Sequence, residues 1–274
     1  MLSSRISNNP SSPVRMTEQN PRLILAVEIG NTTLGVSVMQ EGQVVGVDYW
    51  DTVRSADGSH YLPLFRSLVQ RYVTQGYIFA GGALTSVVPP LDDVVAQAMQ
   101  EALGQPVHVV TRADIEKRLP IAIEDPTSVG KDRLLDCLGA MTIASAPLLV
   151  IDMGTATTVN VVDAEGRFRG GMIIPGVQTS VNALSAKATL LPSIELVAPK
   201  RLLGQFTVEC MQSGAVYGFA AMVDGLIDRI CIETHTSYHV IATGGWGELI
   251  IPHCVHDILY DPCLQIKGLT RVLR

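Results

Sequence analysis

One pattern occurs twice in the chain, and it constrains the fold more than any other feature of the sequence. In each copy an apolar run ends in an acid, one further residue, a glycine and a polar turn, and a second apolar run follows. The first copy is EIGNT at 28–32 and the second is DMGTA at 152–156. A spacing of 124 residues (152 against 28) is too long for a solenoid repeat. The duplication predicts two similar α/β domains that face each other across a cleft.

Apolar periodicity predicts the same order of elements in both halves. Each half begins with three strands joined by turns, as in an antiparallel meander, and continues with helices and further strands. The helical signal is clear in YLPLFRSLVQRYVT at 61–74, where apolar residues recur every three or four positions. We expect strands at 23–29, 34–39, 43–49, 77–84, 107–110, within 148–176 and at 238–242, and helices at 61–74, 91–103, 177–187, 207–232 and 245–251.

The composition excludes several classes of function. Apolar residues make up 47% of the 274 positions and charged residues 17%, as in a well-buried globular protein. The net charge is −6, no basic stripe is present, and aromatics are only 5%, so we expect no nucleic-acid partner. The longest apolar runs, such as PLLVI at 147–151, are far shorter than a membrane span, so we expect no membrane partner.

The N-terminus and the cysteines bear on location. Residues 1–21 are rich in Ser, Asn and Pro and have no apolar core, so we expect a disordered leader that is not a secretory signal. The five cysteines are scattered and form no CxxC pair. This usage favours reduced thiols and a cytoplasmic location.

The two glycine turns are suited to holding phosphate. A tight turn after a strand presents backbone N–H groups, and Thr and Asn side chains add donors. A carboxylate at the end of the same strand can hold Mg²⁺, directly or through water. One copy alone could be an ordinary hairpin, whereas two equivalent copies favour a nucleotide clamped from both sides. Glycines in 170–176 and 240–245 would allow a base or ribose to approach, or would simply mark turns.

A third candidate is GKDRLLD at 130–136, which places an aspartate between two cations at the start of an expected helix. A carboxylate that accepts a hydroxyl proton during phosphoryl transfer must be ionised, and neighbouring cations favour that state. The alternative is a solvated helix start, where aspartate is favoured by capping and by the helix dipole. This segment alone favours the alternative, and both interpretations stay open.

Together these segments resemble the type III pantothenate kinases of the acetate kinase/hexokinase/actin-like superfamily. The resemblance covers nearly the whole chain after about residue 22. EIGNTTLGV resembles the family's phosphate loop, DPTSVGKDRLLDCLGA resembles the pantothenate segment with its Gly-x-Asp-Arg, and IDMGTATTVNVV resembles the second phosphate loop. TSVVPP, TVECMQSG, VIATGG and DPCLQIKGL keep the family's order.

The resemblance implies a fold and a reaction. The fold would be two duplicated ribonuclease H-like domains of the actin-like ATPase fold, at 22–125 and 126–274, with an interdomain cleft. The reaction would be ATP-dependent phosphorylation of pantothenate to 4'-phosphopantothenate, the first step of coenzyme A biosynthesis. It implies Mg²⁺ or another divalent cation, K⁺ or NH₄⁺ as a monovalent cation, and a homodimer.

The resemblance also implies roles for residues at matching positions. Asp132 would be the catalytic base, Asp152 would hold the monovalent cation, and Glu28 would face Mg²⁺ through water. The remaining implied contacts are Gly30, Asn31, Thr32, Thr33, Gly154 and Thr155 with ATP, and Gly130, Lys131, Arg133 and Thr207 with pantothenate, Thr207 reaching across the dimer interface.

Three departures from the family pattern define the alternatives. Glu28 replaces the usual aspartate of the first loop, Asn160 replaces an aspartate near the second, and Lys131 replaces a small residue beside the base. Lys131 would attract the pantothenate carboxylate or crowd the pocket. One alternative is therefore a catalytically weakened homologue that acts as a nucleotide-binding regulator. The other is a kinase for another small hydroxyl substrate, and the Gly-Lys-Asp-Arg segment argues against it.

Overall fold

Each half of the chain builds a five-stranded mixed sheet, and the two sheets have the same connectivity. The structure is a computed structural model that describes residues 21–55 and 57–273. The expected leader at 1–21 lies outside the described residues except for Pro21. Within the described part of the chain, no helix is both long enough and apolar enough to cross a bilayer.

The first sheet has the strand order β3-β2-β1-β4-β5. The first three strands form the expected meander, because β1 pairs antiparallel with β2 and β2 with β3, whereas β1 pairs parallel with β4 and β4 with β5. Parallel pairs need crossover connections, and helices supply them. The strands are β1 (Arg22–Ile29), β2 (Thr33–Gln40), β3 (Gln43–Asp51), β4 (Ile78–Ser86) and β5 (Val107–Val109).

The second sheet repeats this arrangement in the order β10-β9-β6-β7-β8. Here β6, β7 and β8 form the meander, and β9 and β10 are parallel to β6. The predicted duplication is therefore confirmed strand by strand, with β1 and β6 at corresponding central places. The strands are β6 (Leu148–Met153), β7 (Ala156–Val162), β8 (Phe168–Pro175), β9 (His239–Thr243) and β10 (Ile258–Tyr260).

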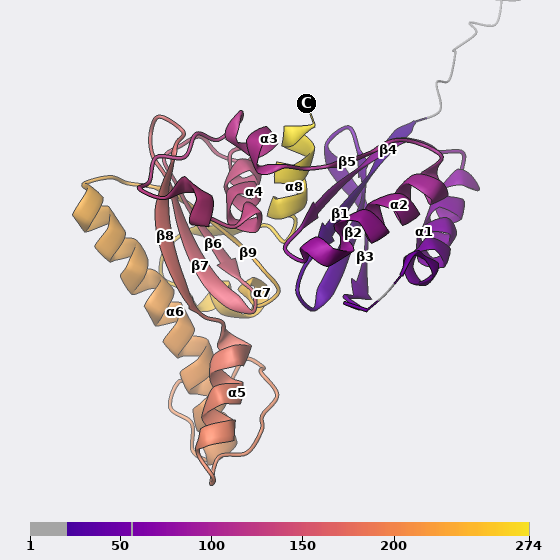
Figure 1. The fold of residues 1–274 in the computed structure, drawn as a ribbon. Helices are drawn as coiled ribbons and strands as arrows, with labels where there is room; N and C mark the ends of the chain where they lie inside the picture. The colour runs from indigo at the N-terminus through magenta and orange to yellow at the C-terminus, as the bar shows by residue number, and fades with distance from the viewer. Residues whose placement is uncertain (1–20, 56, 274) are drawn as a thin grey trace, which may run out of the picture.

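The helices divide into outer helices and a central pair. Figure 1 shows α4 and α8 side by side between the two sheets, with α1 and α2 on the outer side of the first sheet. The helices are α1 (Gly58–Val73), α2 (Asp92–Leu103), α3 (Arg112–Glu116), α4 (Lys131–Ala140), α5 (Val177–Lys187), α6 (Thr207–Thr234), α7 (Gly247–Ile250) and α8 (Leu264–Val272).

The central pair crosses at very short range because each helix presents a glycine to the other. A Cβ at Gly139 of α4 would lie 2.0 Å from the carbonyl oxygen of Leu264, and one at Gly268 of α8 would lie 1.9 Å from that of Leu135. Only glycine fits such a contact between backbones. One hydrophobic core runs from the first sheet through both helices to the second sheet. The crossing therefore fixes the two halves against each other.

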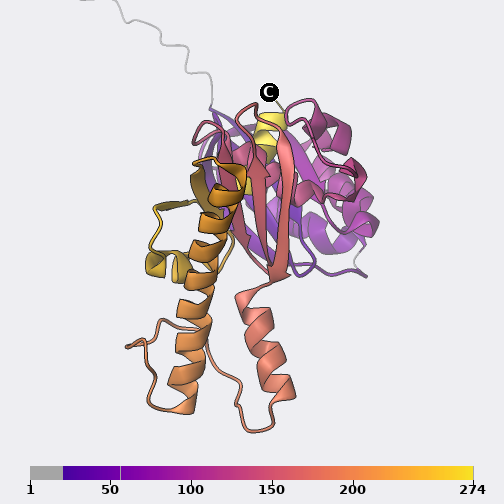
Figure 2. The same cartoon turned by 90° about the vertical axis from the view of Figure 1, so that its left-hand side faces the viewer.

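The central helices connect the two sheets. Helix α4 contacts β6 and β7 of the second sheet and β4 of the first, and α8, the last helix along the chain, contacts β1 and β4 of the first sheet. We retain the division at 22–125 and 126–274 as a proposal, with α8 crossing back onto the first sheet. Figure 2 shows that α5 and the lower part of α6 project from the body as an arm.

Candidate active site

Both glycine turns open into one cleft of about 710 Å³ between the halves. The ends of β1 and β6 bring them there, because these strands occupy corresponding places in the two sheets. The first turns of α4 and α8 line the same cleft. Its sequence-predicted lining residues are Glu28, Gly30, Asn31, Thr32, Thr33, Asp132, Asp152, Gly154 and Thr155.

Hydrogen bonds hold the first glycine turn and leave the backbone N–H groups at its tip free to bind a ligand. The N–H of Gly30 donates to the carbonyl oxygen of Thr33 at 2.9 Å, and the Thr52 hydroxyl donates to the carbonyl oxygen of Gly30 at 2.8 Å. Within the described residues, no hydrogen bond uses the N–H groups of Asn31 or Thr32. Gly30 therefore shapes the turn, and the two following residues supply the donors that can bind an anion.

The second turn is also held by hydrogen bonds of its backbone, although in a different pattern. The N–H of Gly154 donates to the carbonyl oxygen of Ala156 at 3.1 Å. The carbonyl of Thr155 accepts from the N–H of Gly176 at 3.1 Å and from the Thr179 hydroxyl at 2.8 Å. A Cβ at Gly176 would lie 2.3 Å from the carbonyl oxygen of Gly154, so a glycine is required there. Thr155 lines the cleft, and within the described residues no hydrogen bond uses its N–H or its hydroxyl.

Four carboxylates gather at the floor of the cleft: Glu28 on β1, Asp152 on β6, and Asp132 and Asp136 on α4. Burial raises the pKa of Glu28 to about 8, and the charges of Asp152 and Asp132 add to the rise. Burial and the Asp132 charge raise the pKa of Asp152 to about 7. The pKa of Asp136 lies well above its ordinary value, first through burial and then through the other three acids. Among the described residues no lysine, arginine or histidine lines this cleft.

This donor set fits a divalent cation that is shared with a phosphate. Mg²⁺ prefers carboxylate oxygens and commonly takes one or two of them, completing its shell with water and substrate phosphates. Across residues 21–55 and 57–273, no three acidic, histidine or cysteine side chains form a ready-made metal cage. Glu28 and Asp152 are the carboxylates at the ends of the two strands, and because burial is the main cause of their raised pKa values, bound cations would favour their ionised forms.

The first turn of α4 places Asp132 in the cleft, and Gly130 makes room for it. Gly130 is the residue that precedes the helix, and a Cβ there would lie 2.2 Å from Oδ1 of Asp132. The Gly-x-Asp spacing therefore lets the carboxylate fold back over the helix start. Aspartate is a favoured residue in the first turn of a helix, where its carboxylate meets the positive end of the helix dipole.

Arg133 points in another direction, toward the second sheet. Its Nε donates to Oδ1 of Asn160 at 2.7 Å, and its guanidinium lies 5.6 Å from the centre of the Phe168 ring. The Asn160 amide nitrogen donates to the Thr158 hydroxyl at 3.1 Å, which fixes the amide so that its oxygen faces Arg133. Burial lowers the pKa of Arg133. Among the described residues no carboxylate forms an ion pair with this half-buried cation.

Two other sequence-predicted residues lie away from the cleft. The Lys131 ammonium donates to the carbonyl oxygen of Val110, at the end of the first sheet. Thr207 begins α6 on the projecting arm, where it lines a second, apolar pocket of about 580 Å³. The structure does not bring Thr207 of this chain to the carboxylates.

Several cleft residues have no predicted role. Asp136 follows Asp132 by four residues on one helix, and this spacing, which places both on one helix face, could have indicated it. The amide of Gln265, from α8, faces the Glu28 carboxylate and donates to it in the orientation that satisfies both groups. Tyr49 of β3 pairs with Gly35 of β2, which in turn pairs with Glu28 of β1, so the three residues lie side by side across the sheet. No sequence pattern connects Gln265 or Tyr49 to the cleft.

Gly244 closes the cleft behind Asp152. Its φ of +88° is a left-handed conformation, and a Cβ there would lie 2.4 Å from Oδ1 of Asp152. The Tyr260 hydroxyl donates to the carbonyl oxygen of Gly244 at 3.0 Å and so holds the turn. The first of the two glycines that end VIATGG is thus explained by backbone geometry and by the nearness of the carboxylate, whereas a Cβ at Gly245 would meet no atom within 4 Å.

Comparison with known families shows what this chain is similar to. The family model described as type III pantothenate kinase matches residues 24–229. A type III pantothenate kinase from Moorella thermoacetica is 35% identical over 257 residues, covering 91% of this chain and 98% of that protein. One from Thermus thermophilus is 34% identical over 253 residues, with the same coverage of 91% and 98%.

Solved structures show the fold. A Campylobacter jejuni protein assigned to the Baf family of transcriptional activators has a TM-score of 0.56 at 17% identity and covers 91% of this chain and 96% of that one. A ROK family transcriptional regulator has a TM-score of 0.51 at 10% identity, covering 92% and 78%. At these identities the likeness concerns the fold alone, and with the two equivalent sheets it confirms the expected actin-like ATPase fold.

Proposed function

The chain belongs to the type III pantothenate kinase family, and we propose that its cleft transfers the γ-phosphoryl group of ATP to the primary hydroxyl of pantothenate. The product is 4'-phosphopantothenate, in the first step of coenzyme A biosynthesis. One observation carries this assignment: two equivalent glycine turns open into the same cleft, and Asp132 lies in that cleft beside them.

In this proposal the two turns hold the triphosphate from opposite sides. The donors are the N–H groups of Asn31, Thr32 and Thr155 with their side chains and that of Thr33, while Gly30 and Gly154 shape the turns. Arg54, whose Nη2 donates to Oδ1 of Asn31 at 2.8 Å, adds a cation next to the first turn. Such fixed donors stabilise charge that develops during phosphoryl transfer without reorganising.

Glu28 is proposed to face Mg²⁺ through water, and Asp152 to hold the monovalent cation, K⁺ or NH₄⁺. When bound, these cations would neutralise charge on the phosphoryl oxygens. The Gln265 amide holds the Glu28 carboxylate in place on the side of α8. The longer side chain of Glu28, compared with aspartate, is compatible with contact through water, because water spans the distance that direct ligation would fix.

Asp132 is proposed to accept the hydroxyl proton as the pantothenate oxygen attacks in line. In this proposal the two turns hold the phosphoryl group within reach of that carboxylate. Arg133 is proposed to receive the pantothenate carboxylate, since the hydrogen bonds of the described residues use only its Nε, toward Asn160, and no carboxylate among them forms an ion pair with it. Gly130 contributes space for Asp132 rather than a contact of its own.

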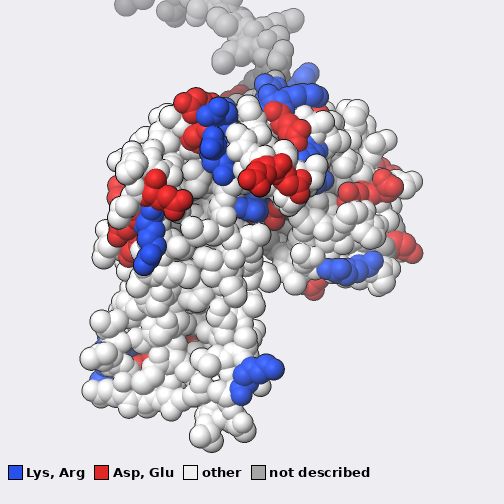
Figure 3. All heavy atoms as spheres, turned by 60° about the vertical axis from the view of Figure 1, so that its left-hand side comes forward, with Lys and Arg blue, Asp and Glu red and all other residues white. Residues whose placement is uncertain are grey.

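A second copy of the chain is proposed to cover the projecting arm. The loop before α6 exposes large apolar side chains yet is firmly held, because buried Glu209 accepts from Nε of Arg201 at 2.9 Å and from the N–H of Gln205 at 2.8 Å. Figure 3 shows few charged side chains on the arm. Thr207 would then face the partner's cleft instead of its own. The exposed apolar residues are Leu184, Leu190, Leu202, Leu203 and Phe206.

We expect Phe206→Asp to convert a dimer into a monomer, because it places a charge in the centre of this apolar surface. Sedimentation velocity measures the change, from twice the chain mass of 29.4 kDa to a single chain. Val73→Asp is the matched control, since Val73 is an exposed apolar residue at the end of α1 in the other half. A wild-type monomer, or a dimer that survives Phe206→Asp, would refute the proposed interface.

The assigned reaction is tested by following ADP release with ATP, Mg²⁺ and K⁺, with and without pantothenate. We expect turnover that depends on pantothenate and on both cations. ATP binding without turnover would favour the nucleotide-binding regulator, and turnover with another small alcohol would favour a different acceptor. No observation on the chain favours either alternative. A biosynthetic role of this kind is consistent with the proposed cytoplasmic location.

A further inference from the structure

The connection between the two halves is fastened by two crossed hydrogen bonds from cations to backbone carbonyls. Nη1 of Arg112, at the start of α3, donates to the carbonyl oxygen of Val129 at 2.7 Å. Nζ of Lys131, at the start of α4, donates to the carbonyl oxygen of Val110 at 3.3 Å. Each cation therefore hydrogen-bonds to a residue that lies just before the helix carrying the other cation. We call these four residues the clasp.

Both carbonyls of the clasp belong to fixed parts of the molecule. Val110 is fully buried, and its N–H donates to the carbonyl oxygen of Leu84 in β4 at 2.8 Å. Val129 is 5% exposed and immediately precedes Gly130, the residue that begins α4. The hydrogen bond of Lys131 thus connects the first turn of α4 to the sheet that carries Glu28 and the first glycine turn.

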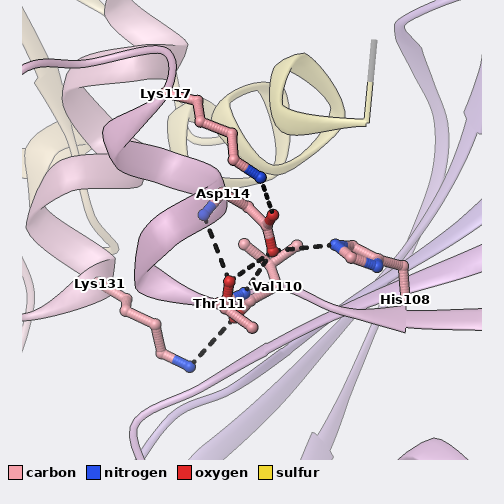
Figure 4. A network of polar contacts seen from close by, with 6 residues as sticks. All are labelled: His108, Val110, Thr111, Asp114, Lys117 and Lys131. Carbon is pink, nitrogen blue, oxygen red and sulfur yellow. Dashed lines mark hydrogen bonds and ion pairs between the residues drawn. The ribbon is translucent and has the colours of Figure 1, made fainter.

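The segment between the two carbonyls of the clasp is held by further polar contacts, as Figure 4 shows. Thr111 and Asp114 form a reciprocal cap at the start of α3. The Asp114 carboxylate also contacts Nε2 of His108 and Nζ of Lys117, both at 3.2 Å. Helix α3 is therefore anchored to β5 and cannot follow α4 freely if the clasp opens.

We propose that Lys131 is a positioning residue that acts through Asp132. Lys131 precedes Asp132 directly, so the bond from its ammonium to Val110 sets how far the first turn of α4, with the Asp132 carboxylate, extends toward the glycine turn of the first half. Hydrogen bonds from charged donors are the stronger kind, which suits a cation to this task. This inference rests on the proposed function for its kinetic consequence, and it assigns Lys131 to the connection rather than to the pantothenate carboxylate.

The test compares Lys131→Met with Lys131→Arg. Methionine keeps an unbranched apolar stem but has no donor, so we expect kcat to fall about tenfold, since small misplacements of a reacting group lower rates by such factors. The KM values for ATP and pantothenate should stay within about twofold of wild type, and Lys131→Arg should restore most of kcat. Lys117→Met is the matched control and should leave both parameters unchanged, because Lys117 bonds to Asp114 of the same network and no hydrogen bond among the described residues joins it to α4.

Amide hydrogen exchange of the metal-free protein without substrate gives an independent readout. Lys131→Met should raise exchange in residues 110–135, and Lys117→Met should raise it only near α3. A raised KM for pantothenate at unchanged kcat would overturn the inference and make Lys131 a substrate contact. Unchanged exchange would overturn it as well. If wild-type protein fails to phosphorylate pantothenate, the exchange result still tests whether Lys131 holds the first turn of α4 to the first sheet.

Discussion

Asp132→Asn should lower kcat for pantothenate phosphorylation by about 10²–10⁴-fold, the range that a positioned general base contributes. Asparagine has nearly the same shape, so the turn over Gly130 and the start of α4 should remain. What is lost is the capacity to accept the hydroxyl proton. Binding of ATP should persist, because the two glycine turns are built from other residues. The measurements are steady-state kinetics and calorimetric titration of ATP.

Asp93→Asn is the matched control for this prediction. Asp93 occupies the first turn of α2, as Asp132 occupies the first turn of α4, and it lies outside the cleft. Loss of its charge should change the net charge and the helix dipole interaction in the same way while leaving kcat unchanged. Undiminished turnover of Asp132→Asn in a folded protein would remove Asp132 from the reaction.

The fold could be predicted because its signals are local and occur twice. The apolar runs around Gly30 and Gly154 define corresponding strand pairs. Because these strands occupy corresponding positions in two sheets of the same topology, their turns reach one cleft. The predicted strands and helices agree with the observed ones to within a few residues, with α6 extending to Thr234, whereas α3, α8 and β10 have no predicted counterpart. The return of α8 onto the first sheet was not predictable, because it depends on the close fit of Gly139 and Gly268 in space.

The direction of side chains was the least predictable part of the site. The sequence places Lys131, Asp132 and Arg133 next to each other, but successive residues on a helix point about 100° apart. Asp132 accordingly enters the cleft while Lys131 turns to the connection and Arg133 to Asn160. Helical spacing from Asp132 would have found Asp136, whereas Gln265 reaches Glu28 only through the tertiary fold.

Without metal, the protein should lose stability as pH rises from 5.5 to 8.5. Glu28 ionises near its ordinary pKa of 4.5 in the unfolded chain but near 8 in the folded protein. Between these values the folded state binds more protons, so the free energy of unfolding falls with rising pH. Asp152, with its pKa raised to about 7, acts in the same direction. For Glu28 alone the full loss, reached above pH 8, is on the order of 3–5 kcal/mol.

Carboxylates with lowered pKa values do not obscure this window. Hydrogen bonds from Ser59, Thr111 and Thr127 lower the pKa values of the acids beside them, Asp57, Asp114 and Asp125. These acids are ionised in both states above pH 5.5, so their contributions are constant there. The slope between pH 5.5 and 8.5, measured by chemical denaturation in the presence of a chelator, therefore reports the acids of the cleft.

Glu28→Gln separates the effect of the buried charge on stability from its role in binding a cation. Glutamine stays neutral at every pH and can still pair with the Gln265 amide, so the variant should be more stable than wild type at pH 8.5 and show a shallower slope. Glu124→Gln, at an exposed position, should leave the slope unchanged. Adding Mg²⁺ with ATP should stabilise wild type most at pH 8.5, where the carboxylates are ionised, and should stabilise Glu28→Gln much less. A stability of metal-free wild type that is flat or rises across this window would mean that burial and neighbouring acids do not keep Glu28 and Asp152 protonated in the folded protein, and the cation site inferred from these two carboxylates would then be wrong.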